Sequence, residues 1–230
     1  MQVQRAEIAR KREERQQAII ERQHSAARDA HAEWIGHDWA TAENAYLQKK
    51  GVPPLGVRED LDANLMVPVL NAEGDLRGLQ YISPEGQKRF QSGMEKNGNF
   101  HLIAEPGKDL SQGEILLAEG YATGASLHMA TEKPVAVAFD AGNLAHVAKA
   151  LHQQNPGALL VVCGDDDRAT EARTGTNTGR VKAQAAAQAV GGLAVFPVGL
   201  EGEASDFNDM HQAQGDRKST RLNSSHTVVS

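Results

Sequence analysis

The sequence predicts an α/β protein built on a parallel sheet, preceded by a small β-rich part and an N-terminal helical arm. Four short, continuously apolar runs, EILLA, PVAVAF, ALLVVC and LAVFPV, lie between positions 114 and 198. Each has the length of a strand that is buried on both faces. Helix-like stretches at 122–131, 144–153 and 180–190 separate these runs. This alternation of strand and helix is typical of a Rossmann-like parallel sheet with right-handed crossovers.

The first 35 residues predict a long charged helix. Residues 2 to about 35 are dense in Ala, Glu, Gln, Arg and Lys, and neither Gly nor Pro occurs before Gly36. Their few apolar positions form a thin stripe, which is typical of a solvated linker helix or a coiled-coil arm. A second, short helix is predicted over 39–49, and it ends at the breaker GVPP at 51–54.

The segment from Leu65 to Ile103 predicts the β-rich part. Apolar and polar residues alternate in LMVPVLNAEGDLRGLQYIS around the turn residues at 71–75, a pattern typical of a β-hairpin. GQKRFQSGMEKNGNFHLIA, at 86–104, is expected to form a second hairpin-like unit with turns at Gly93 and at 97–98. We therefore expect an arm with a short helix (1–51), a β-rich subdomain (52–112), an α/β domain (113–212) and a disordered tail (213–230).

The end of the tail, DRKSTRLNSSHTVVS at 216–230, differs from everything before it. It has no apolar period and is rich in Ser, Thr, Arg and Asn. These residues resemble the translation of a sequencing-library adapter. We therefore expect an artefactual segment from position 216, with the natural sequence continuing differently, and exclude it from the fold.

Composition excludes several classes of function. The single cysteine, Cys163, leaves no internal disulfide and no cysteine-based zinc site within the chain. No run approaches the roughly 18 apolar residues of a membrane helix, and no secretory signal is present. We expect a cytoplasmic protein without a membrane partner. The net charge of −6 argues against DNA binding through bulk charge. It does not argue against an enzyme whose acidic residues hold a metal ion.

Acidic residues follow two of the predicted strands. Glu119 comes directly after the first strand, and the run 165–167, DDD, comes after the third. Ligands of open parallel sheets bind at the carboxyl ends of the strands, where these carboxylates would repel one another unless neutralised. A hard divalent cation, usually Mg²⁺, bound between these carboxylates would neutralise their charges. Asp165 and Asp167 can face one ion while Asp166 points away. The alternative is an exposed acidic loop whose aspartate caps the next helix.

A Glu-Gly pair after the first strand and a D-x-D motif after the third resemble the Toprim domain, the metal-binding domain of bacterial-type primases, topoisomerases and some nucleases. The surrounding segments are similar to conjugative-plasmid and phage primases of the TraC type. They are AYLQKKGV (45–52), LMVPVLNAEGDLRGLQYISPEGQKRF (65–90), FDAGNL (139–144), NTGRVKAQAAA (177–187) and DFND (206–209). The resemblance covers roughly residues 30–212.

The resemblance implies roles for particular residues. Glu119, Asp165 and Asp167 would be catalytic and would hold Mg²⁺, for which Mn²⁺ can substitute, with Glu119 also assisting proton transfer. The metals would bind a ribonucleoside triphosphate and stabilise charge as a 3′-hydroxyl attacks its α-phosphate. The candidates for nucleotide or template contacts are Lys88, Arg89, Arg168 and Lys182. Asp206 and Asp209 are either outer metal ligands or helix caps, and Asn143 and Asn177 are candidates for supporting groups.

The implied function is primase-type nucleotidyl transfer, the Mg²⁺-dependent synthesis of RNA primers on single-stranded DNA. The implied setting is plasmid or phage replication or conjugation, with a replicative helicase as a further partner. Two alternatives stay open. A Toprim nuclease would use the same carboxylates to direct water, and a non-catalytic binding module would make its contacts through the basic helix over 1–23. Whether the chain alone sustains synthesis also stays open.

Overall fold

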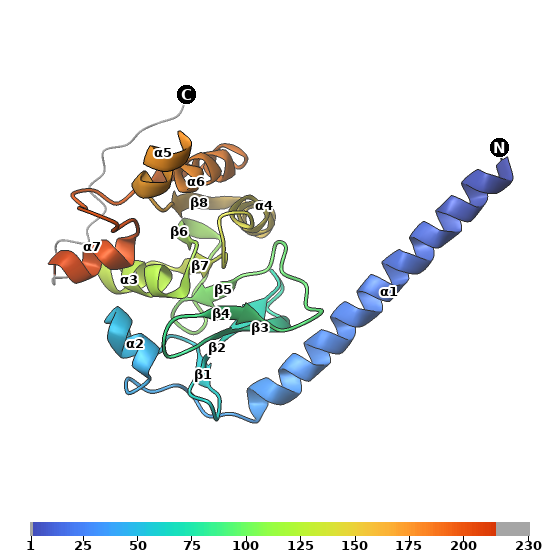
Figure 1. Ribbon diagram of the computed structural model, residues 1–230, viewed down its shortest axis with the longest axis horizontal. Coiled ribbons are helices and arrows are strands. Elements are labelled where there is room, and N and C mark those ends of the chain that lie inside the picture. Colours follow the sequence, from blue (N-terminus) through green and yellow to red (C-terminus); the bar gives the residue numbers. More distant parts are fainter. Residues whose placement is uncertain (1, 215–230) are drawn as a thin grey trace.

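The computed structural model describes residues 2–214, in which a long helix leads into two sheets and their covering helices (Figure 1). The segment expected to be artefactual, 216–230, lies outside the described residues. The predicted arm is the helix α1 (Gln2–Ile35). The short helix α2 (Ala45–Lys50) begins six residues later than the sequence predicts. The reason is Asn44, whose side chain accepts hydrogen bonds from the backbone N–H of Tyr46 and Leu47 and so starts the helix there.

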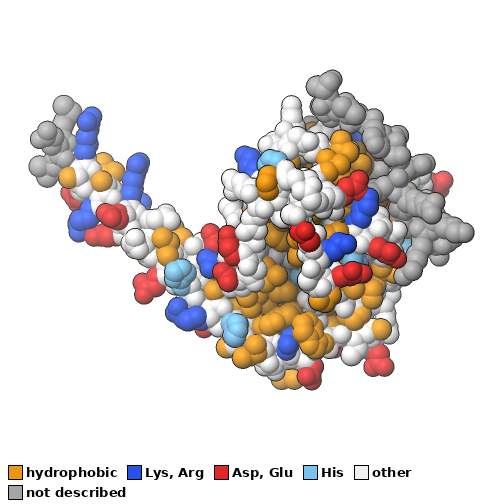
Figure 2. All heavy atoms as spheres, turned by 180° about the vertical axis from the view of Figure 1, so that it is seen from behind, with side chains coloured by type: hydrophobic (Ala, Val, Ile, Leu, Met, Phe, Trp, Pro, Cys, Tyr) orange, Lys and Arg blue, Asp and Glu red, His pale blue; other side chains and the backbone are white. Residues whose placement is uncertain are grey.

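Within residues 2–214, the contacts of α1 with the rest of the molecule come from its last turns. Ala26 and Ala30 are buried, and Ala30 packs against Met66, Leu79 and Tyr81 of the first sheet. The N-terminal part carries alternating acidic and basic side chains and extends away from the body (Figures 1 and 2). Between residues 2 and 214, no helix has both the length and the apolar character needed to cross a membrane.

The first sheet is antiparallel, in the order β1-β2-β3-β4. Its strands are β1 (Arg58–Glu59), β2 (Leu65–Leu70), β3 (Leu76–Ile82) and β4 (Lys88–Phe90). The predicted hairpin around 71–75 is β2 and β3, with Leu65 opposite Ile82. Because side chains alternate along β2, Met66 faces α1 while Leu65, Val67 and Val69 join the main core.

The expected second hairpin over 86–104 is wrong. β4 pairs with β3, whereas β5 (His101–Ile103) pairs with β7 (Val135–Val137) at the edge of the other sheet. A tight turn, in which Ser83 N–H donates to Gln87 C=O at 2.9 Å, returns the chain onto β3. Alternation in a short strand specifies which side chains face inward, but not which neighbouring edge the strand joins.

The second sheet has the order β5-β7-β6-β8-β9, and all strands but β5 are parallel. Its remaining strands, β6 (Gln112–Ala118), β8 (Gly157–Cys163) and β9 (Leu193–Val195), together with β7, confirm the four predicted apolar strands.

The helices α4 (Leu144–Gln154) and α6 (Thr178–Gln188) pack together on one face. On the other face, α3 (Tyr121–Thr131) packs against α7 (Phe207–Gln214). A short helix, α5 (Arg168–Thr174), follows the DDD run. The end of α7 lies two residues inside the segment expected to be disordered from 213.

Candidate active site

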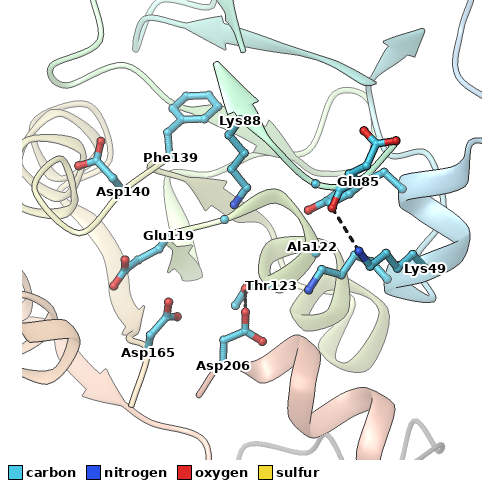
Figure 3. A pocket seen from close by; sticks show the side chains of 14 residues that line it. Lys49, Glu85, Lys88, Glu119, Ala122, Thr123, Phe139, Asp140, Asp165 and Asp206 are labelled. Carbon is cyan, nitrogen blue, oxygen red and sulfur yellow. Dashed lines mark hydrogen bonds between the residues drawn. The ribbon is translucent and has the colours of Figure 1, made fainter. Parts of the chain in front are cut away.

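A cavity of about 400 Å³ lies at the carboxyl ends of β6, β7 and β8, where α2 and the β4 end of the first sheet close over it. Five carboxyl groups and three lysines line it (Figure 3). The acidic residues are Glu85, Glu119, Asp140, Asp165 and Asp206, and the basic ones are Lys49, Lys50 and Lys88. We call Glu119, Asp165 and Asp206 the carboxylate wall, and the three lysines the lysine wall.

Glu119 and Asp165 occupy the turns directly after β6 and β8, which are neighbouring strands. Glu119 Oε1 and Asp165 Oδ1 are both buried and have no hydrogen-bond partner within the described part of the chain. Burial, reinforced by the charges of Asp167 and Asp140, raises the pKa of Glu119 to about 7. Burial, with Glu119 and Asp206 nearby, raises the pKa of Asp165 to about 8. At neutral pH these two carboxyl groups therefore favour either a proton or a cation.

Asp206 both faces the cavity and caps a helix. Its Oδ1 accepts from the backbone N–H of Asp209 at 2.8 Å, and Asp209 Oδ2 accepts from Asp206 N–H at 3.3 Å. These reciprocal bonds form a capping box at the start of α7. Asp206 Oδ2 accepts from the Thr123 hydroxyl at 3.0 Å, inside the cavity. Asp209 does not line the cavity, so of the two alternatives for it the structure shows the cap.

The DDD run directs its side chains to different places. Asp165 lines the cavity, while Asp166 points away from it and accepts from Arg180 Nε at 2.7 Å. Asp167 precedes α5 and does not line the cavity itself. Its charge nevertheless raises the pKa of both Glu119 and Asp165, because it lies near them.

The lysine wall comes from the first half of the chain. Lys49 and Lys50 end α2, and Lys49 Nζ donates to the backbone carbonyl of Glu85 at 3.1 Å. Lys88 reaches across from β4 to the turn after β6, where its Nζ would lie 3.3 Å from a Cβ placed on Gly120. Partial burial lowers the pKa of Lys88, and the carboxylates of Asp206 and Asp165 oppose that shift.

Three of the predicted basic residues lie outside the cavity. Arg89 follows Lys88 on β4 and so faces the other side of the sheet, where its guanidinium lies 3.9 Å from the centre of the Tyr81 ring. Arg168 donates to the backbone carbonyl of Ala204 at 3.1 Å. Lys182 is exposed on α6.

Several residues that line the cavity were not predicted from the sequence. Asp140 directly follows the apolar run PVAVAF and lies three residues after the end of β7, so the strand-end rule that identified Glu119 applied to it equally. Its carboxylate pairs with Lys96. Asn143, a candidate supporting group, is buried and donates from Nδ2 to the carbonyls of Asn99 and Ala138, which anchors the preceding loop to this strand end. No sequence signal linked Lys49, Lys50 or Glu85 to the sheet, since only the fold brings them there.

The carboxylate wall fits Mg²⁺. Within residues 2–214, no three His, Cys, Asp or Glu side chains lie close enough to hold a metal ion by themselves. Mg²⁺ characteristically takes one or two protein carboxylates and completes its octahedral shell with water and substrate phosphate oxygens. Glu119 and Asp165, each with a buried oxygen that lacks a partner among the described residues, supply that partial set of hard oxygen ligands.

The chain is similar to a known domain family and to known DNA primases. Residues 114–217 match the Toprim domain. The chain is 37% identical over 203 residues to a DNA primase TraC of Escherichia coli, which covers 85% of this chain and 14% of that protein. A second Escherichia coli DNA primase TraC is 38% identical over 190 residues, and that match covers 80% of this chain and 18% of the other protein. The chain thus spans less than a fifth of the length of these curated relatives.

Two solved structures share the fold. The primase fragment of the bacteriophage T7 primase-helicase protein has a TM-score of 0.56 at 15% identity, over 81% of this chain and 75% of that one. A DnaG primase catalytic domain bound to single-stranded DNA has a TM-score of 0.54 at 13% identity, over 86% of this chain and 77% of that one. At these identities the likeness concerns the fold alone.

Proposed function

Because this chain belongs to the Toprim-domain DNA primases of the TraC type, we propose that its cavity joins ribonucleoside triphosphates into RNA primers. The template would be single-stranded DNA, and the reaction would depend on Mg²⁺ held by Glu119, Asp165 and Asp167. The setting that the resemblance implies is plasmid or phage replication or conjugation. A replicative helicase is the further partner, and the cytoplasm, where these substrates occur, is the proposed location.

The observation that carries this proposal is the pairing of a carboxylate wall with a lysine wall across one cavity (Figure 3). A triphosphate is strongly anionic, so carboxylates alone would repel it. The lysine ammonium groups attract it, and a cation held by the carboxylates reverses the sign of the opposite wall. When bound, Mg²⁺ would neutralise the charge that develops on the transferred phosphate.

The side chains of the two walls have different proposed roles. Lys88 lies beside Gly120 at the start of α3, where it can hold phosphate oxygens next to Glu119. Asp206 is fixed by its helix cap and by Thr123, so its carboxylate keeps one orientation toward the cavity. Positioning and electrostatic stabilisation are the main contributions a protein makes to phosphoryl transfer, which is why fixed side chains matter here.

The test is the incorporation of labelled ribonucleotides on a single-stranded DNA template, with and without Mg²⁺. We compare the full chain with the double variant Asp165→Asn, Asp167→Asn. Mg²⁺-dependent synthesis that the double variant lacks is the expected result. Equal synthesis by both proteins would contradict the site, and DNA nicking without nucleotides would indicate a nuclease instead.

A second measurement does not require sustained synthesis. We expect the full chain to bind ATP more tightly in the presence of Mg²⁺, and the double variant to lose that Mg²⁺-dependent gain. ATP binding that is the same with and without Mg²⁺ would contradict a metal site that includes the carboxylate wall.

A further inference from the structure

The side chain of Asn177 connects three elements behind the carboxylate wall. Its Oδ1 accepts from the backbone N–H groups of Asp167 and Arg180, both at 3.2 Å. Its Nδ2 donates to Asp166 Oδ1 at 2.9 Å and to Glu171 Oε2 at 3.1 Å. Asn177 is only 5% exposed, and these four bonds use the whole hydrogen-bonding capacity of its amide. One buried side chain thereby joins the DDD run to α5 and α6.

Asp166 is held from several directions at once. Its carboxylate accepts from Arg180 Nε at 2.7 Å and from Arg180 Nη2 at 3.2 Å, in addition to Asn177. Its backbone N–H donates to the carbonyl of Ser205 at 2.7 Å. The Arg180 guanidinium also lies 4.5 Å from the centre of the Phe196 ring, which restricts its orientation. Fixing Asp166 on this side fixes which way its two neighbours face.

The start of α6 also packs directly against the DDD run. A Cβ atom on Gly179 would lie 2.4 Å from the backbone oxygen of Asp165 and 3.3 Å from Asp167 Oδ2. Any larger residue at Gly179 would therefore displace the two aspartates. This contact is independent of the hydrogen bonds of Asn177, and it constrains the same two residues.

We propose that Asn177, acting through Asp166 and Arg180, is a positioning residue that sets Asp165 and Asp167 for metal binding. This inference rests on the proposed function, because it concerns the same metal site. The amide is the suitable group here, since it accepts from two backbone N–H groups while donating to two carboxylates. Neighbouring residues that orient metal ligands typically contribute about 10- to 100-fold to metal affinity.

The test measures metal binding directly, without nucleotide or DNA. Mn²⁺ is titrated into the full chain, and the free ion is followed by electron paramagnetic resonance. We expect Asn177→Ala to weaken Mn²⁺ binding by about 10- to 100-fold. The Mg²⁺ concentration for half-maximal primer synthesis should rise in parallel. The maximal rate should return toward wild type at saturating Mg²⁺, whereas a general loss of folded protein would lower it at every concentration.

Two further variants keep the result interpretable. Asn177→Ser retains a good helix cap but is too short to bridge the carboxylates, so it should fold and still weaken Mn²⁺ binding. Asn155→Ala is the matched control, because Asn155 caps the C-terminal end of α4, before β8, through a 3.1 Å bond to Leu151 C=O. This control should leave Mn²⁺ binding unchanged.

The possible outcomes separate the two proposals. If wild type binds Mn²⁺ no better than the Asp165→Asn, Asp167→Asn variant, the metal site fails and this inference fails with it. If wild type binds and that double variant does not, normal binding by folded Asn177→Ser overturns the positioning role alone. Equal weakening by Asn155→Ala also overturns it, since affinity would then follow general stability.

Discussion

The two walls of the cavity are built in different ways. In the carboxylate wall, Glu119 and Asp165 stand on turns that follow buried parallel strands, whereas Asp206 is fixed by its own helix cap at the start of α7. The lysine wall stands on the end of a six-residue helix and on a three-residue edge strand, and each ammonium group ends a long flexible side chain. The carboxylates therefore have defined positions, whereas the lysines supply charge that tolerates movement.

The two walls differ in the direction of their pKa shifts but share the physical cause, which is burial. The pKa of Asp165 is raised because its carboxylate is buried beside other acids, and the pKa of Lys88 is lowered because the ammonium group is partly buried. Both shifts disfavour the charged form in the absence of a ligand. A cation and a triphosphate bound together would restore both charges, so the two walls become fully charged only with their ligands.

The largest expected effect comes from the carboxylate wall. Asp165→Asn should lower primer synthesis on the order of 10³-fold, because it removes a charged ligand where charge develops in the reaction. Steady-state rates at several Mg²⁺ concentrations check this. If excess Mg²⁺ restored the full rate of synthesis to the variant, Asp165 would contribute to metal affinity alone.

The same substitution should make the metal-free protein more stable at pH 8. Because the pKa of Asp165 is raised from 3.8 to about 8 on folding, folding favours the protonated carboxyl group. The free energy of unfolding therefore falls as the pH rises from about 4 to about 8, the range between the pKa values of the unfolded and the folded protein. The amide of the Asp165→Asn variant cannot ionise, so this variant should be several kcal/mol more stable than wild type at pH 8 and little changed at pH 4. Thermal unfolding with a chelator present measures this difference, and adding Mg²⁺ should stabilise wild type but not the variant.

Lys88→Ala should have the next largest effect. Losing one charge-assisted bond to phosphate is expected to raise the KM for ribonucleotides by about 10- to 100-fold. Initial rates over a range of nucleotide concentrations measure this change. An unchanged KM would place the triphosphate elsewhere than beside Lys88.

Lys49→Ala should have a smaller effect, about 3-fold on nucleotide affinity, because an exposed charge is screened by water and salt. The effect should be visible at low salt and disappear at high salt. Binding measured over a range of KCl concentrations tests this, and an effect independent of salt would indicate a specific contact instead.

Arg89→Ala should have the smallest effect and serves as the matched control for Lys88→Ala. The two residues are adjacent on β4 but face opposite sides of the sheet. Removing the Arg89 contact with Tyr81 should lower the free energy of unfolding by about 0.5–1 kcal/mol and leave the KM unchanged. Urea denaturation and initial rates measure the two effects, and a raised KM would contradict the opposite-face arrangement.

Local patterns predicted much of this fold, and the failures have a common cause. The four apolar strands, the long arm and the first hairpin follow from sequence patterns over neighbouring residues. The pairing of β5 with β7 does not, since His101–Ile103 has the same alternation whichever strand it joins. The resemblance to the TraC-type primases groups Arg89 with Lys88, yet residues adjacent in a strand face opposite ways.

By itself, the sequence determined that acidic residues stand at the ends of parallel strands, because apolar runs and the residues after them are local features. Glu119, Asp165 and Asp167 are identified in this way. Only the tertiary structure decided that Lys49, Lys50 and Lys88 face those acids, that Asp206 faces the cavity while Asp209 does not, and that Asn177 holds the DDD run. Such relations depend on how elements distant in the chain pack together, and no spacing within one segment encodes them.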